Sequence, residues 1–283
     1  MPGQTGARAK QLLVASTAMC FHFGMKELRV WYCCVAVALA GCTTVPETGR
    51  RQLNLMAPAE EMQLGLTSFE QVKKETPINK DPAINALVQK VGQRIATVAP
   101  LPNAQWEFVV FESKEANAFC LPGGKVGVYA GILPVTKDEA GLATVLGHEI
   151  GHAVAHHGAE RMTEALAVQF GGQVVDSSLS KSDPRMHAGL VTAYGVVAQV
   201  GRELPHSRLQ ESEADRLGLI YMARAGYNPE AAIGFWERFA EYNRQHGGSE
   251  GLWFLRTHPL NEVRIKQLKG WLPEVQREYR TPN

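Results

Sequence analysis

The chain has 283 residues, of which 45% are apolar, and this is enough to bury the core of one domain with appendages. Its 29 basic and 28 acidic residues give a formal charge of +1, so the charge does not favour a nucleic-acid partner. We therefore expect a near-neutral folded domain that binds no nucleic acid.

A secretion signal is expected over residues 1–41. A charged segment, Met25–Arg29, is followed by twelve uncharged residues from Val30 to Gly41. An apolar run of this length is too short to cross a bilayer, which needs about 20 residues. Residues 1–24 fit the pattern poorly, and a translation start at Met25 is the simplest account of them.

The signal ends in Leu39-Ala40-Gly41-Cys42, which resembles the lipobox of bacterial lipoproteins. The resemblance implies cleavage before Cys42 and acylation of this residue, which would anchor the chain in a membrane. Thr43 is not Asp, which favours the outer membrane, so a periplasmic position at its inner face is expected. A plain signal peptide that happens to contain Cys42 is the alternative. Cys120 is then the one cysteine of the folded part, and we interpret it as a small buried residue rather than a nucleophile.

Two helices are predicted after a short tether. Residues 42–58 contain Pro46 and Gly49 and are interpreted as a lipid-anchored tether, so the domain is expected over residues 59–283. Apolar residues recur at helical spacing over Glu60–Lys74 and Ala83–Val98, which predicts two core helices. The core face of the first comprises Met62, Leu64, Leu66, Phe69 and Val72.

Two strands follow, over Trp106–Phe111 and Lys125–Tyr129, where aromatic and β-branched residues dominate. The segment Asn117–Gly124 between them contains a tight turn. Two or three strands are thus predicted before the HExxH helix, and an ordinary hairpin is the alternative to a strand edge that binds substrate.

The motif His148-Glu149-Ile150-Gly151-His152 lies in the most apolar stretch of the domain. H-E-x-x-H places both imidazoles on one face of a helix, about 6 Å apart along its axis, where they can chelate a metal ion. The neighbouring residues are apolar almost all round, which predicts a buried helix. Buried imidazoles must be satisfied, and zinc with bound water would do so. Hydrogen-bonded core histidines are the alternative.

Capping signals predict where the helices begin and end. Thr136 and Glu139 form a predicted capping box before the motif, and Gly158 is expected to cap the same helix at its end. A second capping box, Ser207–Gln210, opens a helix that Gly226 closes. Further helices are predicted in two pieces between Arg161 and Val200, after Pro229, and over Asn261–Leu272.

The motif needs a third ligand, because catalytic zinc takes three protein donors and keeps one position open. A histidine at the metzincin spacing would fall at position 158, which is Gly158. His156 and His157 are out of register, and both are interpreted as polar residues at a helix end.

Glu211, on the helix that starts near Ser207, is the better candidate for the third ligand. Asp215 lies one turn further on the same face and could accept the second ring N–H of a zinc-binding histidine. Glu213 is expected to point elsewhere, into solvent.

Four motifs now stand in one order: NAFCLPGGKVGV at 117–128, HEIGH at 148–152, ESEAD at 211–215 and THPLNEVR at 257–264. In this combination the chain resembles the HtpX and CAAX-prenyl-protease family of gluzincin metallopeptidases, over about residues 48–270. The predicted lipobox points to its bacterial periplasmic branch. The resemblance implies an α+β fold that is mainly α. We expect a zincin-like domain with a small β-sheet beside the HExxH helix and a helical C-terminal part.

The resemblance also implies roles for residues. One Zn²⁺ per chain would be held by His148, His152 and Glu211, with Glu149 as general base. Asp215 would accept a hydrogen bond from the second ring N–H of a zinc-binding histidine.

His258 precedes the last predicted helix, in a loop that could reach the site. It could stabilise the oxyanion, or it could occupy the open zinc position as a latch. Arg264 could order this loop or bind the oxyanion. A helix-capping histidine and a surface arginine are the alternatives.

Zinc peptidases of this plan bind an extended substrate along the free edge of the strand beside the metal helix. By this resemblance, the substrate-binding residues are expected to be Asn117, Gly123, Gly124, Lys125 and Val126.

The implied function is an endopeptidase that degrades misfolded or misassembled cell-envelope proteins. The alternative is a chaperone or assembly factor for outer-membrane proteins, with latent or minor protease activity. A non-catalytic zinc-stabilised scaffold is a third option, against which the intact Glu149 argues.

Overall fold

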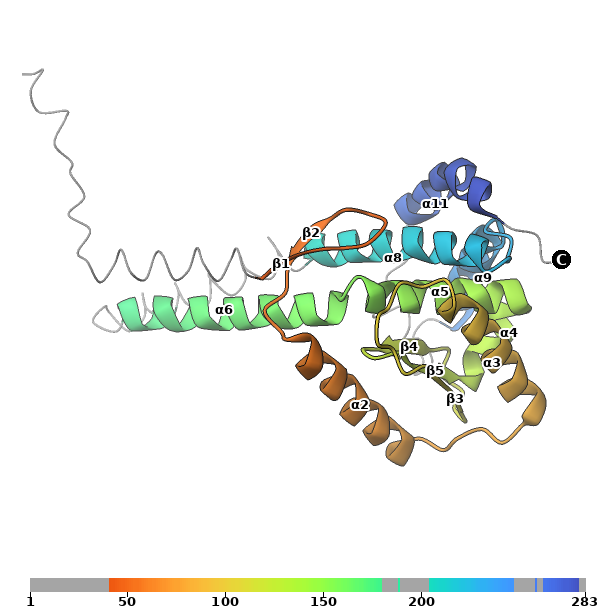
Figure 1. Cartoon of the computed structure of the whole chain (residues 1–283), viewed down its shortest axis with the longest axis horizontal. Coiled ribbons are helices and arrows are strands. Elements are labelled where there is room, and N and C mark those ends of the chain that lie inside the picture. Colours follow the sequence, from red (N-terminus) through yellow and green to blue (C-terminus); the bar gives the residue numbers. More distant parts are fainter. Residues whose placement is uncertain (1–40, 180–187, 189–203, 247–257, 259–261, 280–283) are drawn as a thin grey trace, which may run out of the picture. The chain divides into compact units, whose positions relative to one another are not determined.

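The computed structural model describes residues 41–179, 188, 204–246, 258 and 262–279. The chain divides into two compact units, Met1–Cys42 and Thr43–Asn283, and the account below concerns the second. Its elements, shown in Figure 1, are strands β1 (Cys42–Thr44), β2 (Arg51–Leu53), β3 (Glu107–Phe111), β4 (Ala118–Leu121) and β5 (Lys125–Tyr129), and helices α2 (Pro58–Glu75), α3 (Pro82–Ala96), α4 (Leu133–Thr136), α5 (Glu139–Val154), α6 (His157–Leu179), α8 (Leu204–Arg224), α9 (Ala231–His246) and α11 (Glu262–Val275). Short 3₁₀ turns cover Ala130–Ile132 and Gln276–Glu278. These elements confirm a mainly helical α+β fold.

Helices α5 and α8 lie side by side at the centre of the domain (Figure 1). Small residues line their contact, so the two backbones approach closely. A Cβ on Gly147 would lie 3.0 Å from the carbonyl oxygen of Gly218, and one on Gly151 would lie 3.0 Å from that of Ala214. This spacing brings the residues of α8 next to the HExxH motif on α5.

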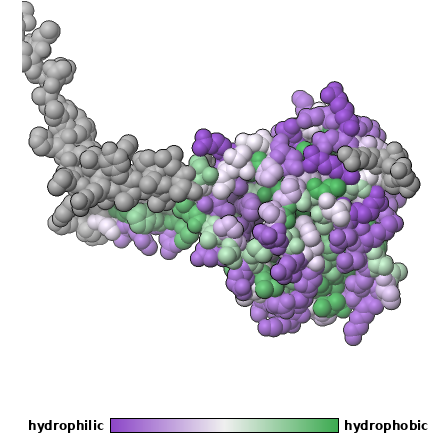
Figure 2. Space-filling model, viewed as in Figure 1, coloured by the Kyte–Doolittle hydropathy of each residue, from purple (hydrophilic) through white to green (hydrophobic). Residues whose placement is uncertain are grey.

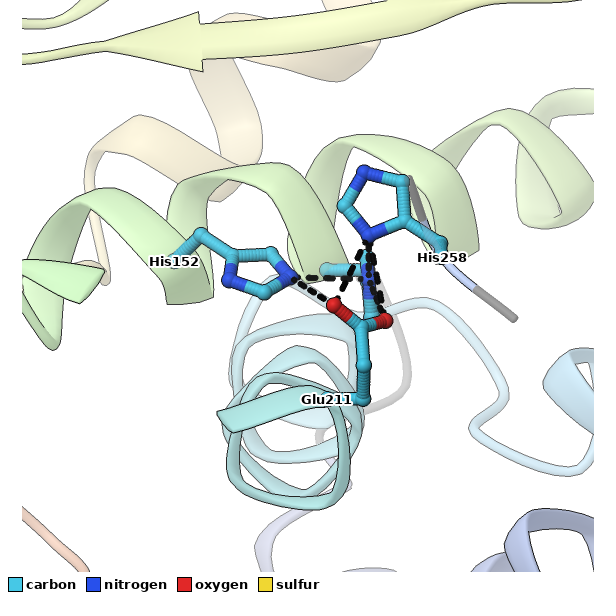
Figure 3. A group of neighbouring side chains, drawn as sticks. His152, Glu211 and His258 are labelled. Carbon is cyan, nitrogen blue, oxygen red and sulfur yellow. Dashed lines mark hydrogen bonds and ion pairs between the residues drawn. The ribbon is translucent and has the colours of Figure 1, made fainter. Parts of the chain in front are cut away.

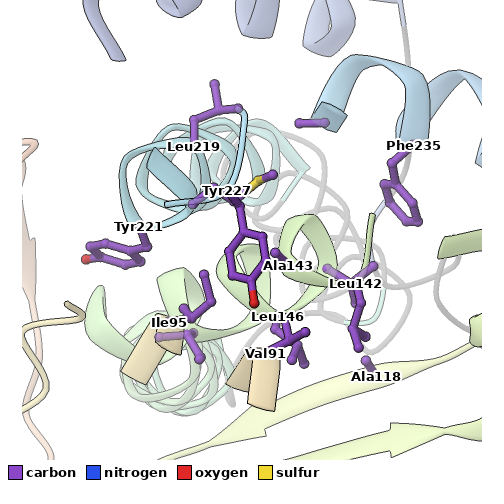
Figure 4. Close-up of a cluster of buried hydrophobic side chains, with 14 of the residues drawn as sticks. Val91, Ile95, Ala118, Leu142, Ala143, Leu146, Leu219, Tyr221, Tyr227 and Phe235 are labelled. Atoms are coloured by element: carbon purple, nitrogen blue, oxygen red, sulfur yellow. The ribbon is translucent and has the colours of Figure 1, made fainter. Parts of the chain in front are cut away.

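The core surrounds α5, every residue of which from Gly141 to Val154 is buried. The predicted burial of this helix is therefore confirmed. Figure 4 shows side chains from the neighbouring elements meeting it. The labelled contributors are Val91 and Ile95 of α3, Ala118 of β4, Leu142, Ala143 and Leu146 of α5, Leu219 and Tyr221 of α8, Tyr227, and Phe235 of α9.

The main sheet has three strands in the order β3-β5-β4. β5 pairs in parallel with β3 and antiparallel with β4, so it is the central strand. β4 is an edge strand and packs against α5. The strand that offers a free edge beside the metal helix is therefore Ala118–Leu121.

Helix α2 buries a narrower face than its sequence predicts. Phe69 is fully buried, but Leu64 and Leu66 are 42% and 39% exposed. Gly65 faces the turn after β4, where a Cβ would lie 2.3 Å from the carbonyl oxygen of Pro122. This close backbone approach turns the two leucines outward.

The segment predicted as a tether packs against the domain over Thr43–Leu53. β1 and β2 pair with each other, Val45 is 1% exposed, and the Gln52 side chain donates to the carbonyl oxygen of Ala155 at 2.8 Å. The Leu55 amide donates to Thr163 Oγ1 of α6 at 3.1 Å. These residues are thus part of the fold, which the composition of the segment does not reveal.

Three predicted helix ends differ from the structure. Asp138, rather than Thr136, caps α5, because its side chain accepts from the Gly141 amide at 2.8 Å. The same helix ends at Val154, and His156 then adopts a left-handed φ of 54°, so Gly158 lies inside α6. α8 begins at Leu204, ahead of the predicted capping box at Ser207.

Helix α6 carries an apolar stripe. Met162, Leu166, Phe170 and Val174 are 42%, 58%, 68% and 50% exposed, and they recur every four residues. In Figure 2, hydrophobic areas are visible on the uncovered part of α6, whereas hydrophilic residues cover most of the visible face of the rest. Among the described residues, no helix combines the length and the apolar character that a membrane span requires. The second piece predicted before Val200 lies outside the described residues.

Candidate metal centre

Three side chains from two helices converge on one point. The Nε2 atoms of His148 and His152, both on α5, are 3.1 Å apart. Glu211 on α8 places Oε2 3.4 Å from the first nitrogen and Oε1 3.3 Å from the second. Figure 3 shows Glu211 rising from α8 toward His152. The structure thus brings together the three residues that the sequence predicts as ligands.

These separations fit a metal ion. A tetrahedral ion with bonds of about 2.0–2.1 Å holds its donors about 3.3 Å apart. The donor atoms of His148, His152, Glu211 and His258 lie within 4.8 Å of one another, and all four residues are buried. Burial would raise the pKa of Glu211, but the charge and hydrogen bonds of the three histidines outweigh it and lower the pKa. The site can therefore hold an ionised carboxylate among imidazoles, which is a metal-binding donor set.

His148 is held from behind by Asp215. Its Nδ1 lies 3.0 Å from Asp215 Oδ1, so Nε2 is left to face the metal position. Burial lowers the pKa of His148, but hydrogen bonds to Asp215 and Glu211 outweigh burial and raise it to about 9. An ion would displace this proton, because the ligand form of histidine is neutral.

Glu149 lies between the metal position and an open cleft. It is 4% exposed, and among the described residues its Oε1 has no hydrogen-bond partner, although the Nε2 of His258 lies 3.4 Å away. Burial raises the pKa of Glu149. A carboxylate with a raised pKa at this place is suited to exchange protons with a reacting group.

His258 joins the donor cluster instead of standing at the surface. Its Nδ1 lies 3.2 Å from His148 Nε2 and 3.1 Å from each oxygen of Glu211. With His258 the site has four protein donors, as in closed structural sites, and without it three donors leave one position open. The residues around His258 in the chain, 247–257 and 259–261, lie outside the described part.

Arg264 is 3% exposed, so it is not a surface arginine. It donates to Asp215 through Nε at 2.7 Å and through a terminal nitrogen at 2.8 Å, and its guanidinium lies 4.4 Å from the Trp236 ring centre. Another nitrogen donates to the carbonyl oxygen of His258 at 3.3 Å. Arg264 thus connects Asp215, which contacts His148, to the backbone of His258.

His157 and Glu213 are parts of the site that the sequence analysis missed. Glu213 is 6% exposed, so the expectation that it is solvated is wrong. His157 is fully buried and places its Nδ1 2.7 Å from the Nδ1 of His152. The left-handed turn at His156 redirects the chain after α5 and allows this contact. A sequence signal for this contact exists, because the apolar helix of the motif is followed directly by His156 and His157.

A cleft of about 450 Å³ opens beside these groups. It is lined by strand β4, by Glu149, His152 and His258, and by Glu61, His156 and Arg161 further along. Burial and the nearby charge of Glu149 raise the pKa of Cys120 on β4. This thiol stays protonated, as expected of a residue that is not a nucleophile.

The predicted substrate residues divide into two groups. Asn117 directly precedes β4, and its Oδ1 is buried without a hydrogen-bond partner among the described residues. Gly123 and Gly124 form the turn after β4, with φ of 80° and 81°. Lys125 and Val126 are buried in β5, which is paired on both sides and offers no free edge. These two residues therefore offer no free strand edge, and the edge of this sheet beside α5 is β4.

Comparison with known proteins gives a family match. A model described as Peptidase family M48 matches residues 82–272. The mitochondrial metalloendopeptidase OMA1 of Schizosaccharomyces pombe is 36% identical over 235 residues, which is 82% of this chain and 67% of the relative. The protein of the same name from Saccharomyces cerevisiae is 36% identical over 183 residues, or 63% and 50% of the two chains. The beta-barrel assembly-enhancing protease of Escherichia coli is 28% identical over 241 residues, or 83% and 49%. The chain thus spans about half the length of the last two relatives and two thirds of the first.

Proposed function

Because this chain belongs to peptidase family M48, we propose that it is a zinc-dependent endopeptidase. The observation that carries the proposal is the convergence of His148, His152 and Glu211 at tetrahedral spacing with Glu149 beside them. Zinc is the proposed ion, since two imidazoles and one carboxylate with an open fourth position are typical of catalytic zinc. The family match agrees with the resemblance found in the motifs.

When bound, zinc lowers the pKa of water toward 7 and polarises a carbonyl oxygen. Glu149 accepts a proton from the attacking water while the water oxygen bonds to the scissile carbonyl carbon. As the C–N bond breaks, Glu149 returns this proton to the leaving amine. The raised pKa of Glu149 suits both steps, because the group must gain and lose a proton near neutral pH.

We propose that an extended substrate pairs with the free edge of β4. The amide of Tyr129 donates to the Asn117 carbonyl at 3.0 Å, which fixes the alternation of hydrogen bonds along β4 and β5. By this alternation the N–H and C=O groups of Ala118 and Cys120 point away from β5, toward the edge. The unpartnered Asn117 Oδ1 is a buried acceptor that a substrate N–H could satisfy.

His258 is proposed as a latch, one of its two predicted roles. Its Nδ1 stands at the fourth donor position, and Arg264 holds its carbonyl oxygen. In this arrangement a substrate carbonyl has no place at the metal until His258 withdraws. Arg264 is accordingly proposed to order the loop rather than to bind the oxyanion.

The proposed substrates are unfolded or misassembled cell-envelope proteins. One relative is named a beta-barrel assembly-enhancing protease, and Leu39–Cys42 would attach this chain to a membrane on the periplasmic side. The mitochondrial relatives support the metallopeptidase activity rather than this location. A chaperone or assembly factor with minor cleavage is the second candidate, which the same relative's name favours.

The test uses Glu149→Gln, which removes the base and leaves the three metal ligands in place. The variant should bind one zinc per chain and cleave unfolded casein at least about 100-fold more slowly than the wild type. Cleavage at the wild-type rate would refute the assigned mechanism. If cells that carry the variant keep the protein's role in the envelope, the chaperone candidate replaces the protease.

A further inference from the structure

A buried chain of polar groups leads away from the metal centre behind His152. His152 Nδ1 contacts His157 Nδ1 at 2.7 Å, and His157 Nε2 contacts Glu213 Oε2 at 3.0 Å. Arg50 Nε donates to the same oxygen of Glu213 at 2.6 Å, and Thr48 Oγ1 donates to the other oxygen. The chain thus links a metal ligand to the N-terminal segment between β1 and β2.

The hydrogens of this chain can be assigned. A metal at His152 Nε2 leaves the proton on Nδ1, which then donates to His157 Nδ1. His157 therefore carries its own proton on Nε2 and donates it to the carboxylate of Glu213. Each contact has one donor and one acceptor in this direction, so the ring of His152 is oriented with Nε2 toward the metal.

Arg50 supports the far end of the chain. Besides Glu213, it donates to both oxygens of Glu160 at 2.7 and 2.9 Å. The side chains of Glu160 and Glu213 are 3% and 4% exposed, and that of Arg50 is 15% exposed. The Arg50 cation lies between these two deeply buried carboxylates and stabilises both, because an unpaired buried charge is strongly destabilising.

The arrangement is parallel to the one behind the other imidazole. His148 is followed by Asp215 and then by Arg264, and His152 is followed by His157, Glu213 and then Arg50. In both cases an arginine secures a carboxylate that fixes a ring nitrogen. Arg50 and Thr48 precede residues 82–272, the part that the family model matches, so the match does not assign this role.

We propose that Thr48, Arg50 and Glu213 act through His157 as positioning residues for the metal ligand His152. The N-terminal segment then helps to position a metal ligand. The inference rests on the metal centre of the proposed function. A salt bridge that served only to hold β1 and β2 would not need the contact between the two imidazoles.

The test compares Glu213→Gln and Arg50→Met with the wild type in zinc affinity, measured by competition with a chelator. Replacing partners behind a metal ligand weakens metal binding about 10- to 100-fold, and we expect this loss in both variants. The visible spectrum of the Co²⁺-loaded protein should also change, since it reports the geometry of the ligands. Arg216→Met is the matched control, because Arg216 lies on α8 and pairs with Glu274 at the surface, 3.1 Å away. The control should keep the wild-type affinity and spectrum.

An unchanged zinc affinity and Co²⁺ spectrum, with only a lower melting temperature of the metal-free protein, would overturn the inference. If Arg50→Met does not fold, Glu213→Gln decides alone, because glutamine keeps the size of the side chain. The proposed function fails separately, when the wild-type protein binds no zinc or cleaves no peptide. A wild-type enzyme that does both while the variants bind zinc normally would refute this inference alone.

Discussion

Gly218 of α8 lies against the backbone of His148 on α5, so that a Cβ added to Gly218 would be 2.9 Å from the His148 nitrogen. The spacing of the two helices is therefore set by main-chain atoms next to His148, a proposed metal ligand. Forcing α8 away from α5 at this contact would therefore move His148.

Gly218→Ala should lower the free energy of unfolding of the metal-free protein by about 1–3 kcal/mol, because overpacking a tight contact forces the helices apart. It should also weaken zinc binding, since Glu211 moves with α8. Gly270→Ala is the control, because no atom lies within 4 Å of that Cβ and the residue is helical. This control should raise stability by about 0.5–1 kcal/mol. Denaturant unfolding followed by circular dichroism would show the opposite signs, and equal effects would contradict the account of the helix contact.

Removal of the proposed latch should activate the enzyme. His258→Ala opens the fourth donor position, so the rate of casein cleavage by the zinc-loaded protein should rise. Zinc affinity should fall, because one of four donors is lost. A lower cleavage rate would instead assign His258 to oxyanion stabilisation, the other predicted role.

Strand addition can be tested at Cys120, whose N–H is inferred to point to the free edge of β4. Cys120→Pro removes this donor and should lower kcat/KM for an extended peptide by about 2- to 13-fold, the equivalent of one hydrogen bond. Stability should change little, because proline is tolerated at edge positions that face away from the partner strand. Cys120→Ala keeps the N–H and should retain wild-type kcat/KM. Equal losses in both variants would point to the side chain and count against strand addition.

The ion pair between Glu61 and His156 should make stability depend on pH. The His156 Nδ1 atom lies 2.9 Å from a Glu61 oxygen, and this contact raises the pKa of His156 although partial burial opposes it. A raised pKa stabilises the fold fully below the unfolded pKa of about 6.5, and the contribution is lost as the pH rises through the folded pKa. Glu61→Gln should therefore destabilise the protein more at pH 5.5 than at pH 8.5, by up to about 1 kcal/mol since the imidazole is partly exposed. Thermal unfolding at the two pH values measures this, and a larger effect at pH 8.5 would be inconsistent with the pair.

Part of the donor cluster that the structure brings together could be predicted, because it follows from local patterns. The HExxH spacing requires only helix geometry, and Asp215 one turn after Glu211 likewise needs only the period of a helix. The strand Lys125–Tyr129 was also predictable from its β-branched residues, and it has the predicted bounds.

The parts that could not be predicted depend on contacts between distant segments. Whether β5 or β4 has a free edge depends on which of them pairs with β3. The sequence of neither strand determines this order. Glu213 is charged, so its sequence suggests a solvated residue. Its burial depends on the contact with Arg50, which lies more than a hundred positions earlier in the chain. His157 is likewise placed by a backbone turn at His156, which adopts a left-handed conformation that few non-glycine residues adopt.

The edge strand β4 has only four residues, and this has a consequence for selectivity. If a substrate pairs with this strand as proposed, so short a ladder binds main-chain groups over a few positions and contacts few of the side chains beyond them. A native protein keeps its main-chain groups paired internally and must open locally before it can reach the site. Discrimination between clients would then follow their local unfolding free energies more than their amino-acid order.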